Sequence, residues 1–144
     1  MPLVLVGACF YGYEDFLDYL TNKKYETHIR YLKYIPTVDK LVLLKNANSF
    51  VFPSLYEGFG LPPVEAMRMG CPVLTSDVSA LPEVCGDAAF YVNPSNLSGI
   101  VEGILEIVNN AALRDELVRK GYERSQHFNF NNYKQRLDNV LSNL

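Results

Sequence analysis

Two glutamates frame a glycine-containing loop near the middle of the chain. Glu57 and Glu65 stand on either side of the run Gly58-Phe59-Gly60-Leu61-Pro62-Pro63-Val64. The two glycines can take positive φ angles and let the backbone approach a ligand closely. A carboxylate repels a phosphate, so each glutamate is better suited to accept hydrogen bonds from hydroxyl groups beside one. A diphosphate with a ribose at one end and a hexose at the other would supply both kinds of group.

The residues after the glycines predict the start of a helix. Proline is favoured in a first helical turn, so we expect a helix to begin near Pro62. A helix N-terminus behind a glycine-containing loop is a ready anion site. Because Pro62 and Pro63 carry no N–H, the amides for a phosphate would come from residues 58–61 and from Val64. An alternative fits the chemistry equally well: Glu65 is an acid favoured by the helix dipole, and Glu57 is a solvated loop residue.

Short apolar runs alternate with helix-length amphipathic stretches along the whole chain. The predicted strands are Leu3–Val6, Thr27–Leu32, Ser49–Pro53, Pro72–Ser76 and Ala88–Val92. The predicted helices follow Gly7 (with Phe16, Leu17 and Leu20 on one side) and cover Val38–Ala47, Val64–Met69, Leu97–Asn109, Ala111–Gln126 and Asn131–Leu144.

This alternation indicates an α/β fold. We expect residues 1–144 to form one Rossmann-like domain, with a single doubly wound parallel sheet of about five strands. Helices would cover both faces of that sheet, and the C-terminus would be helical. The continuous apolar run from Leu3 to Val6 predicts a strand buried on both faces. Ligands of such a sheet bind outside the carboxyl ends of its strands, where the 57–65 loop would lie.

Composition excludes several other kinds of protein. With 144 residues and a formal net charge of −3, the chain has no large basic field for nucleic acid. Three cysteines, Cys9, Cys71 and Cys85, lack metal-type spacing and are expected to be buried thiols in the cytoplasm. His28 and His127 are too far apart in the sequence to suggest a metal site. No apolar run approaches the roughly 20 residues that span a bilayer.

The central segment resembles a known family signature. The run FVFPSLYEGFGLPPVEAMRMGCPVLTSDVSALPEVCGDAAFYVNP is similar to that of the group-1 retaining glycosyltransferases, which have the two-Rossmann-domain (GT-B) architecture. LVLVG with GYEDFLDYL, the stretch IRYLKYIPTVDKLVLLKNANSFVFPS and the end from Leu97 with HFNFNNY resemble further parts of the family's C-terminal domain, which binds the donor nucleotide sugar. The resemblance covers essentially the whole chain.

The family pattern implies roles for individual residues. Glu65 would bind the ribose hydroxyls, and Glu57, the candidate catalytic residue, would lie at the donor sugar and touch its hydroxyls. Tyr34 and Ile35 match the loop that borders the base, although both Tyr31 and Tyr34 suit packing better than stacking. Further positions that the resemblance places at the donor or at its rim are Gly58, Phe59, Gly60, Leu61, Gly7, Gly12, Ser76 and Leu81.

The resemblance also implies a reaction. A hexose would pass from a GDP- or UDP-linked donor to a polysaccharide or lipid-linked acceptor, with retention of configuration and without a metal or other cofactor. This form of the motif favours mannose from GDP-mannose. The leaving phosphate would help to deprotonate the acceptor in a front-face displacement. The family pattern places Glu57 beside sugar hydroxyls, which argues against its acting as a covalent nucleophile. We expect a cytoplasmic protein, with peripheral association at the inner face of the membrane as an option.

Two parts of the family's pattern have no counterpart in this sequence. A first strand, followed by a loop with an Arg and a Lys that hold the diphosphate, does not precede Leu3, and neither does the acceptor-binding domain. We therefore expect a piece of a longer enzyme that binds nucleotides weakly and transfers nothing by itself. An alternative is a stand-alone binding subunit that works with a separate acceptor-domain chain. A receiver-type regulatory domain would need clustered acids at the first strand end, where the sequence has Gly7-Ala8-Cys9.

Overall fold

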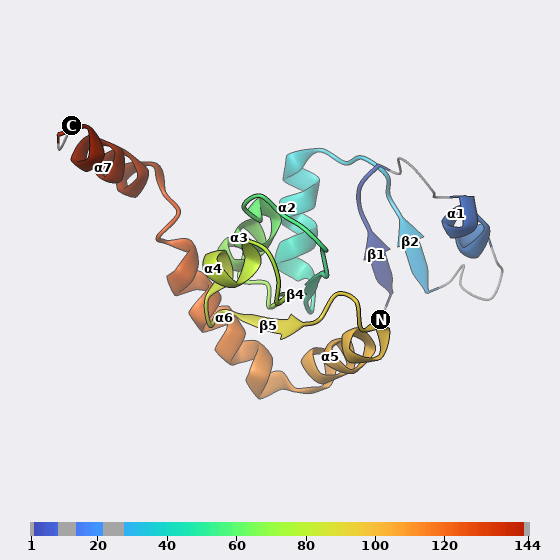
Figure 1. Cartoon of the computed structure of the whole chain (residues 1–144). Helices are drawn as coiled ribbons and strands as arrows, with labels where there is room; N and C mark the ends of the chain where they lie inside the picture. Colours follow the sequence, from blue (N-terminus) through green and yellow to red (C-terminus); the bar gives the residue numbers. More distant parts are fainter. Residues whose placement is uncertain (1, 9–13, 22–27, 143–144) are drawn as a thin grey trace. The chain divides into compact units, whose positions relative to one another are not determined.

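The computed structural model describes residues 2–8, 14–21 and 28–142. The chain divides into two compact units, residues 1–40 and 41–144. Figure 1 shows the order of the helices and strands along the chain. We describe each unit by itself.

The first unit contains a small parallel sheet. Strands β1 (Leu3–Leu5) and β2 (Ile29–Tyr31) pair in parallel, with Leu3 opposite Ile29 and Leu5 opposite Tyr31. Helix α1 (Glu14–Thr21) lies between them in sequence. Phe16 of α1 meets the Tyr31 ring edge to face, with centroids 5.7 Å apart. This aromatic contact joins the helix to the second strand.

Burial of β1 differs from the sequence prediction. Leu3 and Val4 are 50% and 37% exposed, and Val6 just beyond the strand is 45% exposed. The predicted burial of this run on both faces is therefore wrong. The physical reason is size, because a two-stranded sheet of three-residue strands offers helices little surface to cover.

The second unit carries the larger sheet. Strands β3 (Phe50–Phe52), β4 (Val73–Ser76) and β5 (Ala89–Val92) are parallel and lie in the order β3-β4-β5. All four residues of the central strand β4 are buried, as expected for a parallel strand with both faces covered. The helices of this unit are α3 (Leu61–Arg68), α4 (Leu81–Cys85), α5 (Leu97–Asn109), α6 (Ala111–Ser125) and α7 (Phe130–Leu141), and α2 (Thr37–Asn46) leads into it.

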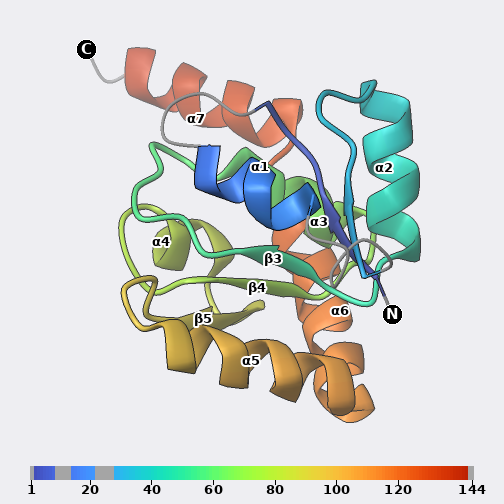
Figure 2. The same cartoon turned by 90° about the vertical axis from the view of Figure 1, so that its right-hand side faces the viewer.

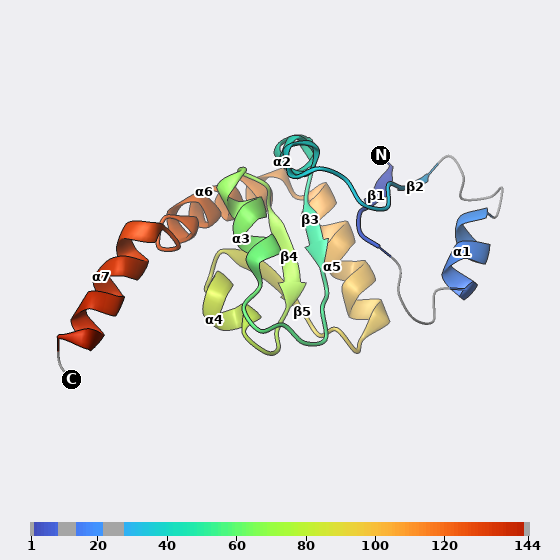
Figure 3. The same ribbon diagram turned by 90° about the horizontal axis from the view of Figure 1, so that it is seen from above.

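Helices cover both faces of this sheet. Figures 2 and 3 show α3 and α4 on one face and α5 on the other. Two buried clusters correspond to these faces. The first contains Ala66 and Met67 of α3, Val73 of β4 and Cys85 of α4, whereas the second contains Leu74, Val92, Ile107 and Leu117 of β4, β5, α5 and α6.

The predicted α/β fold with parallel strands is confirmed. The five strands within the described residues are divided between two hydrogen-bonded sheets of two and three strands, where the sequence analysis expected a single sheet. Helix α4 was missed because its five residues, Leu81–Cys85, are too few to show helical periodicity. Helix α3 begins at Leu61, one residue before the expected proline.

Candidate functional site

The loop between β3 and α3 is held against the end of β4. Parallel pairing sets Phe52 opposite Thr75, so the two strands finish at the same edge of the sheet. The Thr75 hydroxyl donates to the Phe52 carbonyl oxygen at 2.9 Å, and the Ser76 hydroxyl donates to the Ser54 carbonyl oxygen at 2.6 Å. These two bonds anchor the beginning of the loop.

Glu57 is fixed through both its backbone and its side chain. Its N–H donates to Ser79 Oγ at 3.0 Å, and the Ser79 hydroxyl donates back to the Glu57 carbonyl oxygen at 2.6 Å. The Ser54 hydroxyl lies 3.0 Å from Glu57 Oε1 and 3.2 Å from the Tyr56 carbonyl oxygen, with one proton for the two acceptors. The other carboxylate oxygen of Glu57 has no partner among the described residues. The described residues therefore leave one oxygen of this carboxylate as an unused acceptor.

The two glycines of the loop have different roles. Gly60 has φ +98°, and a Cβ added there would lie 2.8 Å from Cδ2 of buried Leu81. Gly58 does not take a positive φ, and an added Cβ would have nothing within 4 Å. Of the two glycines that could take a positive φ, only Gly60 does so, where the chain turns into α3.

The N-terminus of α3 presents a few amides. With Gly60 as the N-cap, the N–H groups of Gly60 and Leu61 have no partner within the helix, and Pro62 and Pro63 carry none. Leu61 is 63% exposed. The N–H of Val64 is the first that the helical bonding pattern uses, and Val64 is buried. Its predicted role as an amide donor to phosphate is corrected for that reason, because the helix begins earlier than expected.

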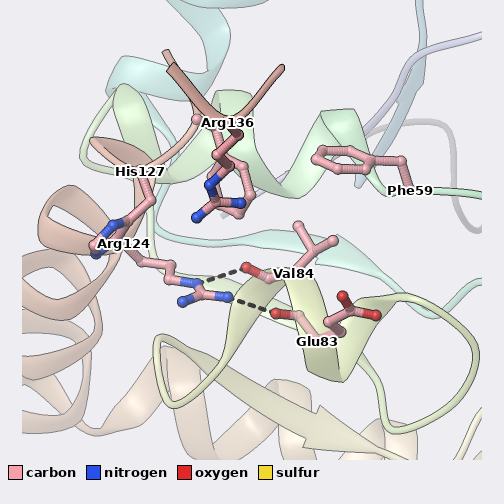
Figure 4. Close-up of a pocket in the computed structure, with 7 residues that line it drawn as sticks. Phe59, Glu83, Val84, Arg124, His127 and Arg136 are labelled. Atoms are coloured by element: carbon pink, nitrogen blue, oxygen red, sulfur yellow. Dashed lines mark hydrogen bonds between the residues drawn. The ribbon is translucent and has the colours of Figure 1, made fainter. Parts of the chain in front are cut away.

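Phe59 extends from the loop into a hollow of about 370 Å³ (Figure 4). Its ring meets Phe128 edge to face, with centroids 5.6 Å apart. Arg124 lies over the Phe128 ring at 5.5 Å and donates to the carbonyl oxygens of Val84 and Glu83, the former at 2.8 Å. The remaining residues around this hollow are His127 and Arg136. The loop thus has an aromatic support made by the turn between α6 and α7.

Helix α3 is tied to α6 at its far end. Arg68 donates to the carbonyl oxygens of Ser125 and Phe128, at 3.4 and 3.2 Å. A Cβ added at Gly121 of α6 would lie 3.1 Å from Cγ of Met67, so the two helices are in close contact. Glu65 lies on α3 in the turn after the prolines and is partly buried.

Ser76 and Leu81 support the loop from the interior of the protein. Both side chains are fully buried, so they do not line the rim that the resemblance implied. Ser76 holds the loop through the Ser54 carbonyl oxygen, and Leu81 fills the space beneath Gly60.

The predicted base-side residues belong to the first unit. Tyr34 is 83% exposed and Ile35 is half-buried. Tyr34 is thus not the packing residue that the sequence suggested, because it follows the end of β2 in an open loop. Gly7 has φ +138°, its N–H donates to the Lys33 carbonyl oxygen at 2.8 Å, and its carbonyl oxygen accepts from the Tyr31 hydroxyl at 2.8 Å. Gly12 lies outside the described residues.

The cysteines are buried thiols where the structure describes them. Burial raises the pKa of Cys71 to about 12 and that of Cys85 to about 11, in the second case against the opposing effect of Arg124. Cys9 lies outside the described residues. Among the residues that are described, no group of three or more His, Cys, Asp or Glu could hold a metal ion. No helix in this part of the chain is long and apolar enough to cross a membrane.

Comparison with known proteins identifies the family. Residues 2–124 match the family model described as glycosyl transferases group 1. The chain belongs to the group 1 glycosyl transferases. This confirms the family that the central segment predicted. The glycine loop and its two glutamates, Glu57 and Glu65, lie inside the matched region.

Two curated relatives of this chain are O-antigen chain mannosyltransferases by their names. O-antigen chain mannosyltransferase B of Escherichia coli is 38% identical over 133 residues, which are 91% of this chain and 34% of the relative. O-antigen chain mannosyltransferase RfbU of Salmonella typhimurium is 30% identical over 114 residues, covering 79% of this chain and 31% of the relative. The chain spans about a third of the length of these relatives.

Solved structures share the fold. Sucrose-phosphate synthase from Thermosynechococcus elongatus superposes with a TM-score of 0.82 at 25% identity, over 98% of this chain and 38% of that one. Anabaena Alr3699/HepE in complex with UDP superposes with a TM-score of 0.84 at 20% identity, over 100% of this chain and 41% of that one. The second likeness is evidence for the fold alone.

The sequence analysis missed several residues that shape the glycosyl transferase loop. Ser54, Ser79 and Phe128 make contacts within or with the loop, and Arg124 lies over the Phe128 ring, but none of the four received a role. Their only signal was position, because Ser54 follows a predicted strand and Ser79 lies in the loop after the next one. Serine is common in such loops, so its presence did not indicate which hydroxyl would meet which backbone group.

Proposed function

We propose that this chain is the donor-binding domain of a glycosyltransferase that takes a hexose from a nucleotide sugar. The observation that carries the proposal is the loop from Ser54 to Gly60, which fixes Glu57 and turns sharply into α3. Such a loop combines a carboxylate for sugar hydroxyls with a helix N-terminus for phosphate. A nucleotide sugar carries both groups side by side.

Each part of the donor has a partner in this proposal. Glu57 accepts from a hydroxyl of the transferred sugar with the oxygen that Ser54 leaves free. The N–H groups of Gly60 and Leu61, with the positive end of the α3 dipole, bind the diphosphate. Glu65 accepts from the ribose hydroxyls. The family resemblance adds four candidate donor-binding residues to this proposal, namely Tyr34 and Ile35 for the base, Gly7 and Gly12.

The donor and acceptor are proposed from the relatives. The curated mannosyltransferases named above favour mannose from GDP-mannose as the donor. So does a further relative, the serotype-specific mannosyltransferase WbdA of Escherichia coli, which is 42% identical over 97 residues. A polysaccharide or lipid-linked saccharide is the acceptor, bound by a further domain, either in the same protein or in a separate partner chain. We propose association with the inner face of the cytoplasmic membrane as the place where such acceptors are glycosylated.

The reaction is proposed to retain the anomeric configuration and to use no metal. The departing diphosphate gains negative charge in the transition state, and fixed N–H dipoles at α3 stabilise that charge. The phosphate oxygen then takes the proton from the acceptor hydroxyl on the same face of the sugar. Glu57 orients the sugar and forms no bond to it. By itself the chain is expected to bind the donor without transferring its sugar.

The test is a titration of the chain with GDP, UDP and ADP, followed by backbone amide NMR. We expect GDP to shift the amides of residues 58–61 and of Glu65. Glu65→Gln keeps the size of the side chain but removes its charge, which is expected to weaken binding by roughly tenfold or more, since a hydrogen bond to a charged group contributes about 1.5–3 kcal/mol.

Glu102→Gln is the matched control, because Glu102 is an exposed glutamate on α5. The proposal fails if nucleotide added up to about millimolar concentration, the range of weak binding, shifts none of these amides. It also fails if Glu65→Gln binds as well as Glu102→Gln. A larger response to UDP or ADP would correct the base and leave the site in place.

A further inference from the structure

We propose that Ser79 is a positioning residue for the donor site, which holds Glu57 in the conformation that receives the sugar. This inference rests on the proposed function, because it assigns a role to the residue behind Glu57. Ser79 lies in the loop between β4 and α4, 22 residues from Glu57 in sequence. Nothing in the glycine loop itself supplies the contacts that Ser79 makes.

The backbone of Ser79 is in a conformation that serine rarely adopts. Its φ is +61°, in the left-handed region, and it shares this property with only Lys33 among the non-glycine residues that the structure describes. Glycine would take this conformation without the clash of a Cβ. Strained residues of this kind are often found at functional sites, where the surrounding structure holds them in place. The side-chain contacts of Ser79 are what distinguish it from a glycine at this position.

The hydroxyl of Ser79 makes two bonds with one peptide segment. It accepts from the N–H of Glu57 at 3.0 Å and donates to the carbonyl oxygen of Glu57 at 2.6 Å. One hydroxyl thus bonds to both the backbone N–H and the backbone carbonyl oxygen of Glu57, as a residue of a neighbouring strand does in a sheet. This clamp fixes the backbone on both sides of the Glu57 side chain.

A second hydroxyl fixes the side chain itself. Ser54 lies 3.0 Å from Glu57 Oε1, and the carbonyl oxygen of Ser54 is held by buried Ser76 at 2.6 Å. Ser54, Ser76 and Ser79 together leave Glu57 little freedom in either backbone or carboxylate. Of the three, Ser79 is the one whose hydroxyl is exposed and acts on the backbone of Glu57 alone.

Glu57 in turn faces the sugar end of the donor, so the effect of Ser79 is expected there. Loss of the clamp would weaken the contact with the sugar and leave the nucleotide contacts at α3 unchanged. The affinity for GDP-mannose should then fall while the affinity for GDP does not. A residue that merely stabilised the fold would lower both affinities together.

The variant Ser79→Gly removes the hydroxyl and relieves the backbone strain, so the fold is kept. The matched control is Ser95→Gly, because Ser95 is an exposed serine in a turn whose own hydroxyl makes no bond among the described residues. Two quantities are measured on each variant. The first is the exchange rate of the Glu57 amide, which NMR follows without any ligand. The second is the ratio of the dissociation constants for GDP and GDP-mannose.

We expect the Glu57 amide of Ser79→Gly to exchange at least about tenfold faster than in the unchanged chain, because its hydrogen bond is gone. We expect the preference for GDP-mannose over GDP to fall by roughly three- to tenfold, which is the size of one hydrogen bond. Ser95→Gly should change neither.

The possible results separate this inference from the proposed function. Unchanged exchange at Glu57 overturns the clamp. Faster exchange with an unchanged preference for GDP-mannose overturns the positioning role. Absence of any nucleotide binding by the unchanged chain overturns the proposed function, and the positioning role with it.

Discussion

Gly60 and Gly58 lie two residues apart in one loop, yet the structure predicts opposite results when each is changed to alanine. Gly60 has φ +98°, and an added Cβ would lie 2.8 Å from Cδ2 of Leu81, which is fully buried. Gly58 has neither a positive φ nor an atom within 4 Å of an added Cβ. The pair therefore compares the same substitution in a constrained and in an unconstrained position.

The cost at Gly60 has two parts. A left-handed backbone costs a non-glycine residue about 1–2 kcal/mol, and overpacking against a buried side chain adds about 1–3 kcal/mol. We expect Gly60→Ala to lower the free energy of unfolding by roughly 2–5 kcal/mol in total. Gly58→Ala should stay within about 0.5 kcal/mol of the unchanged chain.

Urea unfolding followed by far-UV circular dichroism measures both values. In a chain of this length the loss at Gly60 corresponds to a fall in Tm of roughly 5–15 °C. A double-mutant cycle with Leu81→Val separates the two parts, because the smaller side chain relieves the contact and leaves φ unchanged. Equal unfolding midpoints for Gly60→Ala and Gly58→Ala would refute the reasoning. If the losses in unfolding free energy from Gly60→Ala and Leu81→Val were strictly additive, the contact with Leu81 would be refuted. The cost of a left-handed backbone at residue 60 would not be.

Two further predictions concern ionisable groups. With Cys9 replaced by serine, Cys71 and Cys85 should not react with a disulfide reagent at pH 8, since pKa values of about 12 and about 11 leave almost no thiolate. Both thiols should react once the chain is unfolded in urea. Fast reaction of the folded chain would contradict their burial. Lys120 donates a hydrogen bond to Asp87 and lowers the pKa of that carboxyl group. The ion pair is therefore present at neutral pH and is lost as the pH falls through the lowered pKa. Lys120→Ala should raise the pKa of Asp87 again, which a carboxyl-carbon NMR titration measures.

The sequence predicted the framework of the site but not its internal contacts. Alternating apolar runs and amphipathic stretches gave the parallel strands, and the two prolines after Gly60 gave the position of α3 to within a residue. Burial of Leu3–Val6 was predicted wrongly because an apolar run has the same composition whether or not helices cover it. Helix α4 was missed because five residues contain little more than one helical turn.

The hydrogen bonds around Glu57 depend on register, which the sequence does not state. Ser79 meets Glu57 because β3 and β4 pair with Phe52 opposite Thr75, and a shift by one residue would place other groups there. The left-handed conformation of Ser79 could not be predicted either, since it belongs to glycine or asparagine far more often than to serine. Gly58 and Gly60 could both take a positive φ, and the sequence did not indicate that only Gly60 would.

The two ends of the loop are held by different kinds of interaction, and this difference has a consequence for binding. At the Glu57 end the contacts are hydrogen bonds from Ser54 and Ser79, whereas at the Gly60 end they are the buried Leu81 and the aromatic pair of Phe59 and Phe128. A ligand that bound a mobile loop would lose part of its affinity to the ordering of that loop. Here the ordering is completed during folding, so the contacts to a sugar and to a phosphate start from fixed groups. Because hydrogen bonds and packing fail under different changes, removing a serine hydroxyl should loosen the sugar end alone, and disrupting the packing at Gly60 should disturb the phosphate end together with the fold.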